Sequence, residues 1–447
     1  MGKAKVDTKI RTGIQQVFNK VDLLSPVDFA TLAIEARNNA YVSQGGNLLD
    51  PDNVRAAQFR LQKFQDFLAS GRIGTDWQDE IFRSAMFQEY QVNVSGGSKE
   101  ISYMFSGGVL DNNGIVKNSG FTRYSFRANI GAKLSKKIDA GLRINPVFTE
   151  QDFLRTTERY HNTNAGIIQA ALLMDPTLDV YDPSSLSGYT TGIQQGHGMV
   201  NIENPVAKMN LLKDKRKNFR FLGDLFINYK IIKGLDFKMT GSINTNTYYQ
   251  NGIVPSTIGG YAQIAPRDNT ILANSNFVMN YQTAAQLTYN KAINKHNLTM
   301  VGVYESQFQK TNGMNARAEG TWTDKLIIVD SSLDESYRQG SSSISEWAIS
   351  SWIARVSYNY NKKYYLTSSL RIDGSSRFAN RWGTFPAISV AWRVSQENFL
   401  KNYLWISDMK MRASYGETGN NTIGNYKYMS EMRGNSYVFG VGDEVVR

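Results

Sequence analysis

The feature that most constrains the fold is a period-two alternation of apolar and polar residues between positions 352 and 416. Four segments show it, and in one of them Ile388 and Val390 alternate with Ser389 and Ala391. Successive side chains of a β-strand point to opposite faces, so each segment is predicted to be a strand with one apolar and one polar face. A soluble antiparallel sheet and a transmembrane barrel with a wet lumen both have this pattern.

The alternation recurs along the chain and predicts about thirteen strands. Most of them are expected to have about ten residues or more, which exceeds the about five to six residues usual in soluble proteins and fits a tilted strand that crosses a bilayer. The expected strands are 6–14, 87–96, 100–110, 120–134, 138–147, 217–231, 235–248, 277–290, 297–309, 344–360, 364–373, 387–394 and 409–416.

Short and long connections alternate between these strands. Because consecutive connections of an up-and-down sheet lie at opposite ends, all the long ones are predicted to lie at the same end, as the extracellular loops of outer-membrane barrels do. Asn-Gly dipeptides at 113–114, 251–252 and 312–313 are interpreted as turns within the long connections. The expected short connections are 96–99, 135–137, 232–234, 291–296 and 361–363, and the long ones are 18–86, 111–119, 148–216, 249–276, 310–343 and 374–384.

Helices are predicted within two of the long connections. Ser25 is a typical N-cap and Pro26 suits the first helical position, so a helix is expected to begin there. A second helix is expected over residues 53–70, with Gly71 as its C-terminal stop. A further helical segment is expected over residues 165–174.

Composition and motifs argue against an enzymatic site. The chain has no cysteine, so disulfides and thiolate metal sites are excluded. Its three histidines, His161, His197 and His296, lack the spacing of zinc ligands and are interpreted as surface or loop residues. No nucleophile elbow, His-Glu-x-x-His run or phosphate loop occurs. We therefore expect no enzyme activity, no catalytic residues, no metal site and no cofactor, and the substrate-binding residues are unknown at this stage.

Charge and hydropathy narrow the possible partners. The net charge is +11, but the basic residues are spread along the chain, and their densest run, 213–217, directly precedes a strand. A solvated turn explains this run better than a nucleic-acid surface, so no nucleic-acid partner is expected. The mean hydropathy of −0.39 is compatible with a membrane barrel, since half of each barrel strand is polar. The first residues lack the apolar core of a signal peptide.

Several runs of residues resemble a known family. Leu-Arg-Ile-Asp-Gly-Ser-Ser-Arg-Phe at 370–378 and Trp-Gly-Thr-Phe-Pro-Ala at 382–387 resemble the hallmark run of SusC/RagA-type TonB-dependent outer-membrane transporters. Ala-Trp-Arg at 391–393 and Met-Arg-Ala-Ser-Tyr-Gly-Glu-Thr-Gly-Asn at 411–420 continue the resemblance. Motifs similar to the early barrel of that family occur at 75–77, 94–98, 123–129 and 204–207.

The resemblance implies an all-β fold, namely an antiparallel up-and-down transmembrane β-barrel with long, partly helical extracellular loops. Barrels of this kind have about 22 strands, so we expect a barrel fragment with about thirteen of them that lacks the signal peptide, the plug and the last strands. The implied function is import of a large nutrient, such as an oligosaccharide or a peptide, across the outer membrane. The implied partners are a SusD-like surface lipoprotein, the TonB complex acting through the plug, outer-membrane lipid and the cargo. The expected organisation is a first barrel strand at 1–17, a long extracellular loop with two helices at 18–86, and barrel strands with alternating short periplasmic turns and long extracellular loops at 87–447.

Each surface of such a barrel has an expected role. The apolar face is expected to contact lipid through Val356, Leu366, Val390 and Ala413, and the polar face to line the lumen through Ser357, Thr367, Ser389 and Ser414. Arginines of the polar face are expected to pair with carboxylates of the plug or lumen rather than with cargo, and these are Arg123, Arg127, Arg143, Arg355, Arg371, Arg393 and Arg412. Exposed aromatic residues of the long loops are expected to help dock the lipoprotein and contact cargo, and these are Tyr189, Tyr261, Trp322 and Tyr337.

The alternative interpretation is a soluble, secreted β-rich module that binds carbohydrate or acts as an adhesin. Such a module dissolves in buffer, whereas a transporter barrel partitions with membranes and needs detergent.

Overall fold

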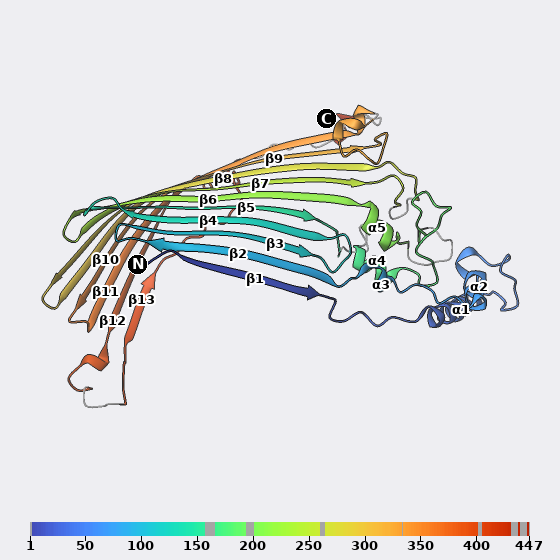
Figure 1. Cartoon of the computed structure of the whole chain (residues 1–447), viewed down its shortest axis with the longest axis horizontal. Coiled ribbons are helices and arrows are strands. Elements are labelled where there is room, and N and C mark those ends of the chain that lie inside the picture. The colour runs from blue at the N-terminus through green and yellow to red at the C-terminus, as the bar shows by residue number, and fades with distance from the viewer. Residues whose placement is uncertain are drawn as a thin grey trace.

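A single antiparallel sheet of thirteen strands dominates the computed structural model of the chain. Each strand pairs with the strands before and after it in the sequence, so the sheet is an up-and-down meander (Figure 1). The predicted all-β fold and the predicted number of strands are confirmed. The structure describes residues 2–156, 166–193, 201–259, 264–332, 334–400, 405–430, 437–438 and 445–446.

The sheet is strongly curved but open. Its edge strands, β1 and β13, pair with one neighbour each, and the strand direction turns across the sheet, so that β11 to β13 run at a steep angle to β1 to β5 in the view of Figure 1. Two short strands, β14 (Tyr437–Val438) and β15 (Val445–Val446), form a separate sheet. The thirteen strands are β1 (Lys5–Gln15), β2 (Ala85–Gly97), β3 (Ile101–Asn113), β4 (Gly120–Lys133), β5 (Ile138–Asp152), β6 (Lys213–Ile232), β7 (Leu235–Val254), β8 (Thr270–Ile293), β9 (His296–Glu319), β10 (Arg338–Tyr360), β11 (Tyr364–Ser375), β12 (Trp382–Trp392) and β13 (Met411–Gly416).

Strands β6 to β10 are longer than the alternation predicts. They have 20 to 24 residues and pair with one another along almost their whole length. The Asn-Gly dipeptides at 251–252 and 312–313 lie inside β7 and β9, so their interpretation as turns is wrong. Both are hydrogen-bonded in ladders on two sides, which outweighs the weak strand propensity of Asn and Gly. The two long connections predicted there are shortened to residues 255–269 and 320–337.

The connections at the two ends of the sheet differ in length. One end has tight turns such as 294–295 and 233–234, where Asn294 and Gly234 have the positive φ angles, 52° and 87°, that such turns favour. The other end has the long connections and the helices (Figure 1). One connection departs from the predicted alternation: residues 393–410 join β12 to β13 at the tight-turn end and include a 3₁₀ helix, η4 (Val394–Gln396).

The first and the fourth helix lie where the sequence predicts them. The Ser25 hydroxyl accepts a hydrogen bond from the Asp28 amide at 3.1 Å and caps α1 (Pro26–Ser43). α4 (Ile167–Leu173) corresponds to the helical segment expected over 165–174. Of the helices in the described residues, none is both long enough and apolar enough to cross a membrane.

The second helix is shorter than predicted. α2 (Gln62–Ser70) ends as expected at Gly71, which has a φ of 67°. Its predicted start at residue 53 is wrong, because the Asp52 carboxylate accepts hydrogen bonds from the amides of Leu61 and Gln62, each at 2.7 Å, and caps the helix there. The preceding residues contain only a 3₁₀ helix, η1 (Ala57–Phe59).

Fully buried apolar side chains concentrate at the long-loop end rather than along the sheet. One core joins α4 to α3 (Trp77–Ile81) and α5 (Pro205–Leu211), with Ile81, Ile167 and Val206 among its buried members. We call this group of helices and its core the helical cap. A smaller core around Phe64 joins α1 to α2.

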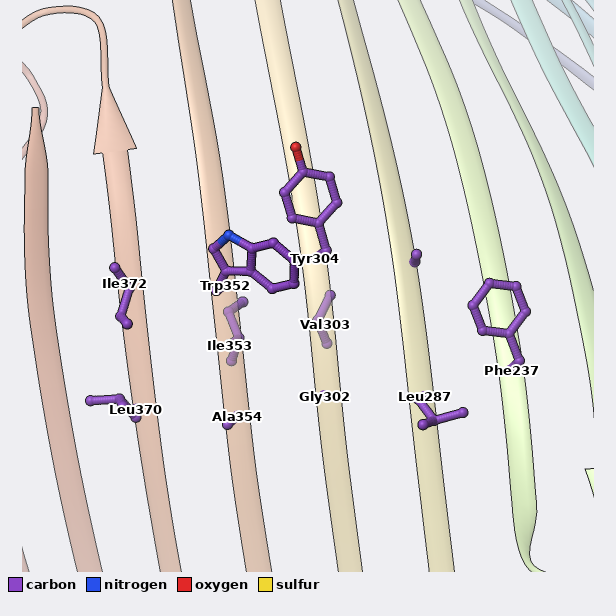
Figure 2. A pocket seen from close by; sticks show the side chains of 11 residues that line it. Phe237, Leu287, Gly302, Val303, Tyr304, Trp352, Ile353, Ala354, Leu370 and Ile372 are labelled. Atoms are coloured by element: carbon purple, nitrogen blue, oxygen red, sulfur yellow. The ribbon is translucent and has the colours of Figure 1, made fainter.

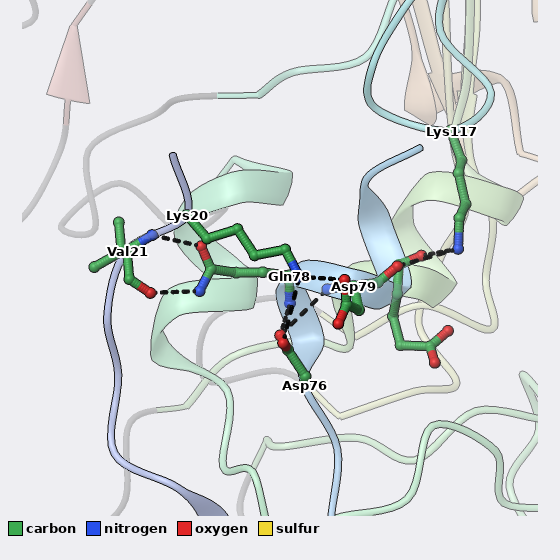
Figure 3. A network of polar contacts seen from close by, with 7 residues as sticks. Lys20, Val21, Asp76, Gln78, Asp79 and Lys117 are labelled. Atoms are coloured by element: carbon green, nitrogen blue, oxygen red, sulfur yellow. Dashed lines mark hydrogen bonds and ion pairs between the residues drawn. The ribbon is translucent and has the colours of Figure 1, made fainter. Parts of the chain in front are cut away.

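A network of polar contacts ties the chain after β1 to α3 (Figure 3). The buried Gln78 amide accepts a hydrogen bond from the Val21 amide at 2.9 Å and donates one to the Val21 carbonyl at 2.8 Å. Lys20 forms ion pairs with Asp76, at 3.5 Å, and with Asp79. The long connection that leaves β1 is therefore fastened to the helical cap near its start.

Candidate functional site

The apolar face of the sheet is uncovered. Every second residue is exposed along β12 and over residues 364–370 of β11, and on β12 the accessible fractions are 49% for Ile388 and 48% for Val390, whereas Ser389 between them is half-buried. Val356 and Leu366, predicted to contact lipid, are likewise exposed on this face. Ala413, also predicted there, pairs with Val390 and shares the face. Contact of these residues with lipid itself stays a prediction.

The same face has an apolar depression of about 370 Å³ (Figure 2). Gly302 and Ala354 are direct cross-strand neighbours on β9 and β10, and their small size makes the floor. The rings of Tyr304 and Trp352, whose centroids lie 4.6 Å apart, border it. The depression offers almost only carbon atoms, so an apolar environment suits it better than water.

The opposite, polar face carries ion pairs both within and between strands. Arg371 forms a hydrogen-bonded ion pair with Asp373 at 2.7 Å and donates to the fully buried Ser351 hydroxyl at 3.0 Å. Arg143 on β5 pairs across the strands with Asp224 on β6 at 3.4 Å. A face of this kind can exchange its hydrogen bonds with hydroxyl, amide or charged groups of a polar solute.

Four of the seven arginines predicted on the polar face pair with acids of this chain. Their partners are Glu89 for Arg123 at 3.5 Å, Asp224 for Arg143 at 3.4 Å, Asp373 for Arg371 and Asp408 for Arg393 at 2.8 Å. Within the described residues, no ion pair forms at Arg127, Arg355 or Arg412. These four have carboxylate partners as expected, and the preference for such partners over cargo stays a prediction.

A pocket of about 230 Å³, the loop-end pocket, lies at the long-loop end of β6 to β9. Gly252, Leu272 and Arg317 are cross-strand neighbours on the polar face and form its floor. Residues 153–155, α5 and the connection 255–269 contribute its walls. Sequence reasoning missed this pocket, because its residues come from five distant parts of the chain.

Buried charges stand next to the loop-end pocket. Burial raises the pKa of the Glu203 carboxyl above its usual value, although the amides of Asn204 and Gly259 donate hydrogen bonds to it at 2.9 and 2.8 Å. Burial also lowers the pKa of the Arg267 guanidinium, and the Arg317 charge acts in the same direction, whereas the carboxylates of Glu203 and Glu319 act against it. Charges of both signs are therefore partly removed from water in this region.

The aromatic residues predicted in the long loops have different environments. Trp322 and Tyr337 are exposed, with accessible fractions of 64% and 47%. Tyr189 is half-buried, so the prediction that it is exposed is wrong: its ring packs 5.3 Å from that of Tyr181 against the helical cap. Tyr261 lies outside the described residues.

The three histidines do not form a site in the part of the chain that the structure describes. His296 lies at a tight turn, where its Nδ1 and the Tyr358 hydroxyl share a hydrogen bond of 2.7 Å. His161 and His197 lie outside the described residues. Among the described residues, no three His, Asp or Glu side chains gather in a way that could hold a metal ion.

Comparisons with known proteins agree on one family. The sequence matches no protein-family model. It is 31% identical over 415 residues to TonB-dependent receptor P3 of Formosa agariphila, an alignment that covers 91% of this chain and 40% of that protein. It is 30% identical over 399 residues to TonB-dependent receptor SusC of Bacteroides thetaiotaomicron, covering 85% of this chain and 38% of that protein.

The fold comparison gives the same result. The solved RagAB peptide transporter superposes on the whole chain with a TM-score of 0.77 at 19% identity, and the match covers 50% of that structure's chain. The chain spans about 40% of the length of the curated relatives that it matches. The resemblance to SusC/RagA-type TonB-dependent receptors is confirmed, and the open sheet has the fold of part of such a barrel.

Proposed function

From its SusC/RagA-type sequence and fold, we propose that this chain forms part of the barrel of a TonB-dependent outer-membrane transporter that imports a large nutrient, such as an oligosaccharide or a peptide. The observation that carries the proposal is the uncovered apolar face. Apolar side chains such as Val356, Leu366 and Val390 alternate with polar ones and remain exposed in the folded chain. Burying such a face in hydrocarbon stabilises the sheet, whereas leaving a patch of this size in water favours aggregation.

The polar face is the proposed path of the cargo. Its ion pairs and amide groups, such as Arg371 with Asp373, are suited to a hydrated lumen. Import through a barrel of this type is driven by the TonB complex acting through a plug, and we propose the same for the protein that contains this chain. Such a role requires no covalent chemistry of the barrel.

A SusD-like surface lipoprotein is the proposed partner at the long-loop end. Trp322 and Tyr337 are exposed there, and large aromatic side chains are the type that anchors protein interfaces. The connection that carries them is folded rather than slack, since Thr321 and Ser332 pair in a β-bridge within it.

The soluble adhesin or carbohydrate-binding module is the weaker alternative. A soluble β-sandwich covers the apolar face of one sheet with another sheet. Here the described residues leave that face uncovered across β11 and β12.

Membrane fractionation tests the central proposal. The protein expressed from its native gene should stay with the outer membrane through an alkaline wash and require detergent for release. Recovery in the soluble fraction after the wash contradicts the proposal and favours the adhesin.

Co-purification tests the docking surface. Trp322→Ala and Tyr337→Ala combined should reduce the amount of lipoprotein recovered with the detergent-solubilised protein. Trp405→Ala is the matched control, because Trp405 is also highly exposed, at 81%, but lies in the connection at the tight-turn end. Equal recovery with all variants rules these two residues out as docking anchors.

A further inference from the structure

The lining of the loop-end pocket is strongly asymmetric in charge. Its one acidic side chain, Asp214, is already engaged, since its carboxylate accepts hydrogen bonds from Arg216 and from Gln250, both at 2.9 Å. The basic side chains in the lining are Arg155, Lys208, Lys213, Arg267 and Arg317. The lining therefore holds more basic than acidic side chains, and Glu203 and Glu319 beside it offset part of this charge.

Two guanidinium groups define the polar part of this pocket. Arg317 rises from the polar face of β9, and its Nε donates to the Glu319 carboxylate at 2.9 Å. Arg267 comes from the connection 255–269, and its Nε donates to the Ile258 carbonyl at 2.8 Å, which fixes the direction of the guanidinium. Both guanidinium groups belong to the lining, where Arg317 forms an ion pair with Glu319 and the carboxylates of Glu203 and Glu319 offset part of the Arg267 charge. An anion between them can accept charge-assisted hydrogen bonds from the remaining guanidinium N–H groups.

The rest of the lining is apolar. Leu154, Leu212 and Leu272 lie beside the charged groups. Apolar walls exclude water and strengthen an ionic contact, and they also suit the carbon skeleton that carries an anionic group. Because the floor belongs to the polar face, the pocket opens towards the proposed path of the cargo.

We propose that the loop-end pocket binds an anionic group, a carboxylate or an ester of similar charge, on the cargo, with Arg267 and Arg317 as the residues that hold it. This inference rests on the proposed transport function and adds the chemical class of the substrate. Two sources of a carboxylate fit the same chemistry: a uronic acid unit of an oligosaccharide and the C-terminus of a peptide.

Binding measurements on the detergent-solubilised protein from its native gene test this proposal. The probes are oligogalacturonate with its methyl-esterified, neutral form, and an alanine peptide with a free or an amidated C-terminus. At least one charged probe should bind about tenfold or more tightly than its neutral counterpart, and the difference should shrink at high salt. The pair that shows the difference identifies the source of the carboxylate.

Substitutions locate the effect in the pocket. Arg267→Gln and Arg317→Gln should each weaken binding of the charged probe about tenfold and leave the neutral probe unchanged, and Arg317→Lys should restore part of the loss. Lys215→Gln is the control, because Lys215 carries the same charge at the same end of β6 but pairs with Asp152 outside the pocket. Unfolding temperatures equal to that of the unaltered protein show that the variants fold.

Two outcomes overturn the inference: equal binding of charged and neutral probes, or unchanged binding of the charged probe by folded Arg267→Gln and Arg317→Gln variants. If either occurs while the protein fractionates with the outer membrane, the transport function stands and the anionic cargo does not. If the charged probe binds but the protein is recovered in the soluble fraction, the transport function fails instead.

Discussion

The helical cap buries its apolar side chains, whereas the sheet leaves those of one face exposed. In the cap, Ile81 and Ile167 are almost completely buried among residues of the same chain. In the sheet, Ile388 and Val390 point away from the chain and stay exposed. The helical cap therefore has an apolar core of its own, as a small protein in water does. The apolar side chains of the sheet are not covered by the chain and can be buried only by the surrounding medium. On the proposed transport function, the helical cap is the part that contacts water and the apolar face of the sheet is the part that contacts hydrocarbon.

The largest expected difference in stability is between an Ile→Ala substitution in the helical cap and one on the apolar face of the sheet. Ile81→Ala removes a fully buried side chain and is expected to destabilise the helical cap by about 2–5 kcal/mol, because a cavity remains. Ile388→Ala should cost far less, since mobile lipid or detergent chains fill the space. Urea unfolding of the two variants in detergent, followed by proteolysis of the cap, measures both. Similar costs at the two positions would contradict the proposed division.

Within the sheet, the two faces of β10 can be compared by introducing an arginine on each face in turn. Val356→Arg should destabilise the membrane-inserted protein by about 2–4 kcal/mol if the residue lies near the bilayer midplane. Ser357→Arg, one residue along but on the polar face, should cost much less. Equilibrium folding into lipid bilayers gives both values. Equal effects at neighbouring positions are not compatible with a membrane barrel.

Removing the N-cap side chain of α3 should destabilise the helical cap and leave the stability of the sheet unchanged. The Asp76 carboxylate accepts hydrogen bonds from the amides of Gln78 and Asp79 at the start of α3, at 2.9 and 3.2 Å. Asp76→Ala should therefore cost about 1 kcal/mol, whereas Asp76→Asn keeps an N-cap oxygen and serves as control. Hydrogen exchange should become faster in α3 and stay unchanged in the sheet. Faster exchange in β11 or β12 would show that the two regions are not separate.

The smallest expected effect lies at the tight-turn end and depends on pH. Glu397 accepts hydrogen bonds from Tyr364, Trp392 and Lys363 at 2.6, 3.1 and 3.0 Å, and these contacts lower the pKa of its carboxyl from 4.5 to about 2. Because the folded-state pKa is lowered, the contribution to stability is complete above about pH 4.5 and is lost as the pH falls towards about 2. The protection factors of amides in residues 393–400, corrected for the pH dependence of the intrinsic exchange rate, should fall over that window in the unaltered protein, and Glu397→Gln should remove this change. A pH profile that is the same in both proteins would assign the effect to another group.

The sequence predicts the sheet well because strand alternation is local. Every second residue of a segment such as 388–392 reveals the faces without knowledge of its partners. The helical cap could not be predicted in this way, since Trp77 donates a hydrogen bond to the Asp175 carbonyl, 98 positions away, and the core joins three separate segments. The lengths of β7 and β9 were underestimated for a related reason. Pairing with long neighbours keeps Asn and Gly extended, and pairing is not visible in a local window.

The loop-end pocket could not be predicted either, because it also depends on contacts between distant parts of the sequence. Arg267 and Arg317 are 50 positions apart, and the sequence predicts them in two different long connections, 249–276 and 310–343, whereas Arg317 lies near the end of β9. Their meeting depends on the register of β8 with β9 and on the path of the connection 255–269. The sequence therefore indicated a basic chain without indicating where the charge gathers.

Accessibility along β12 tests the central claim most directly. The chain has no cysteine, so single cysteines at positions 388 to 391 can each carry a nitroxide spin label in the protein from its native gene, held in native-like bilayers. Labels at Ile388 and Val390 should collide with oxygen, which concentrates in lipid, and labels at Ser389 and Ala391 with a water-soluble nickel chelate. A profile without this alternation, or one in which the labels at Ile388 and Val390 meet the nickel chelate, contradicts the account.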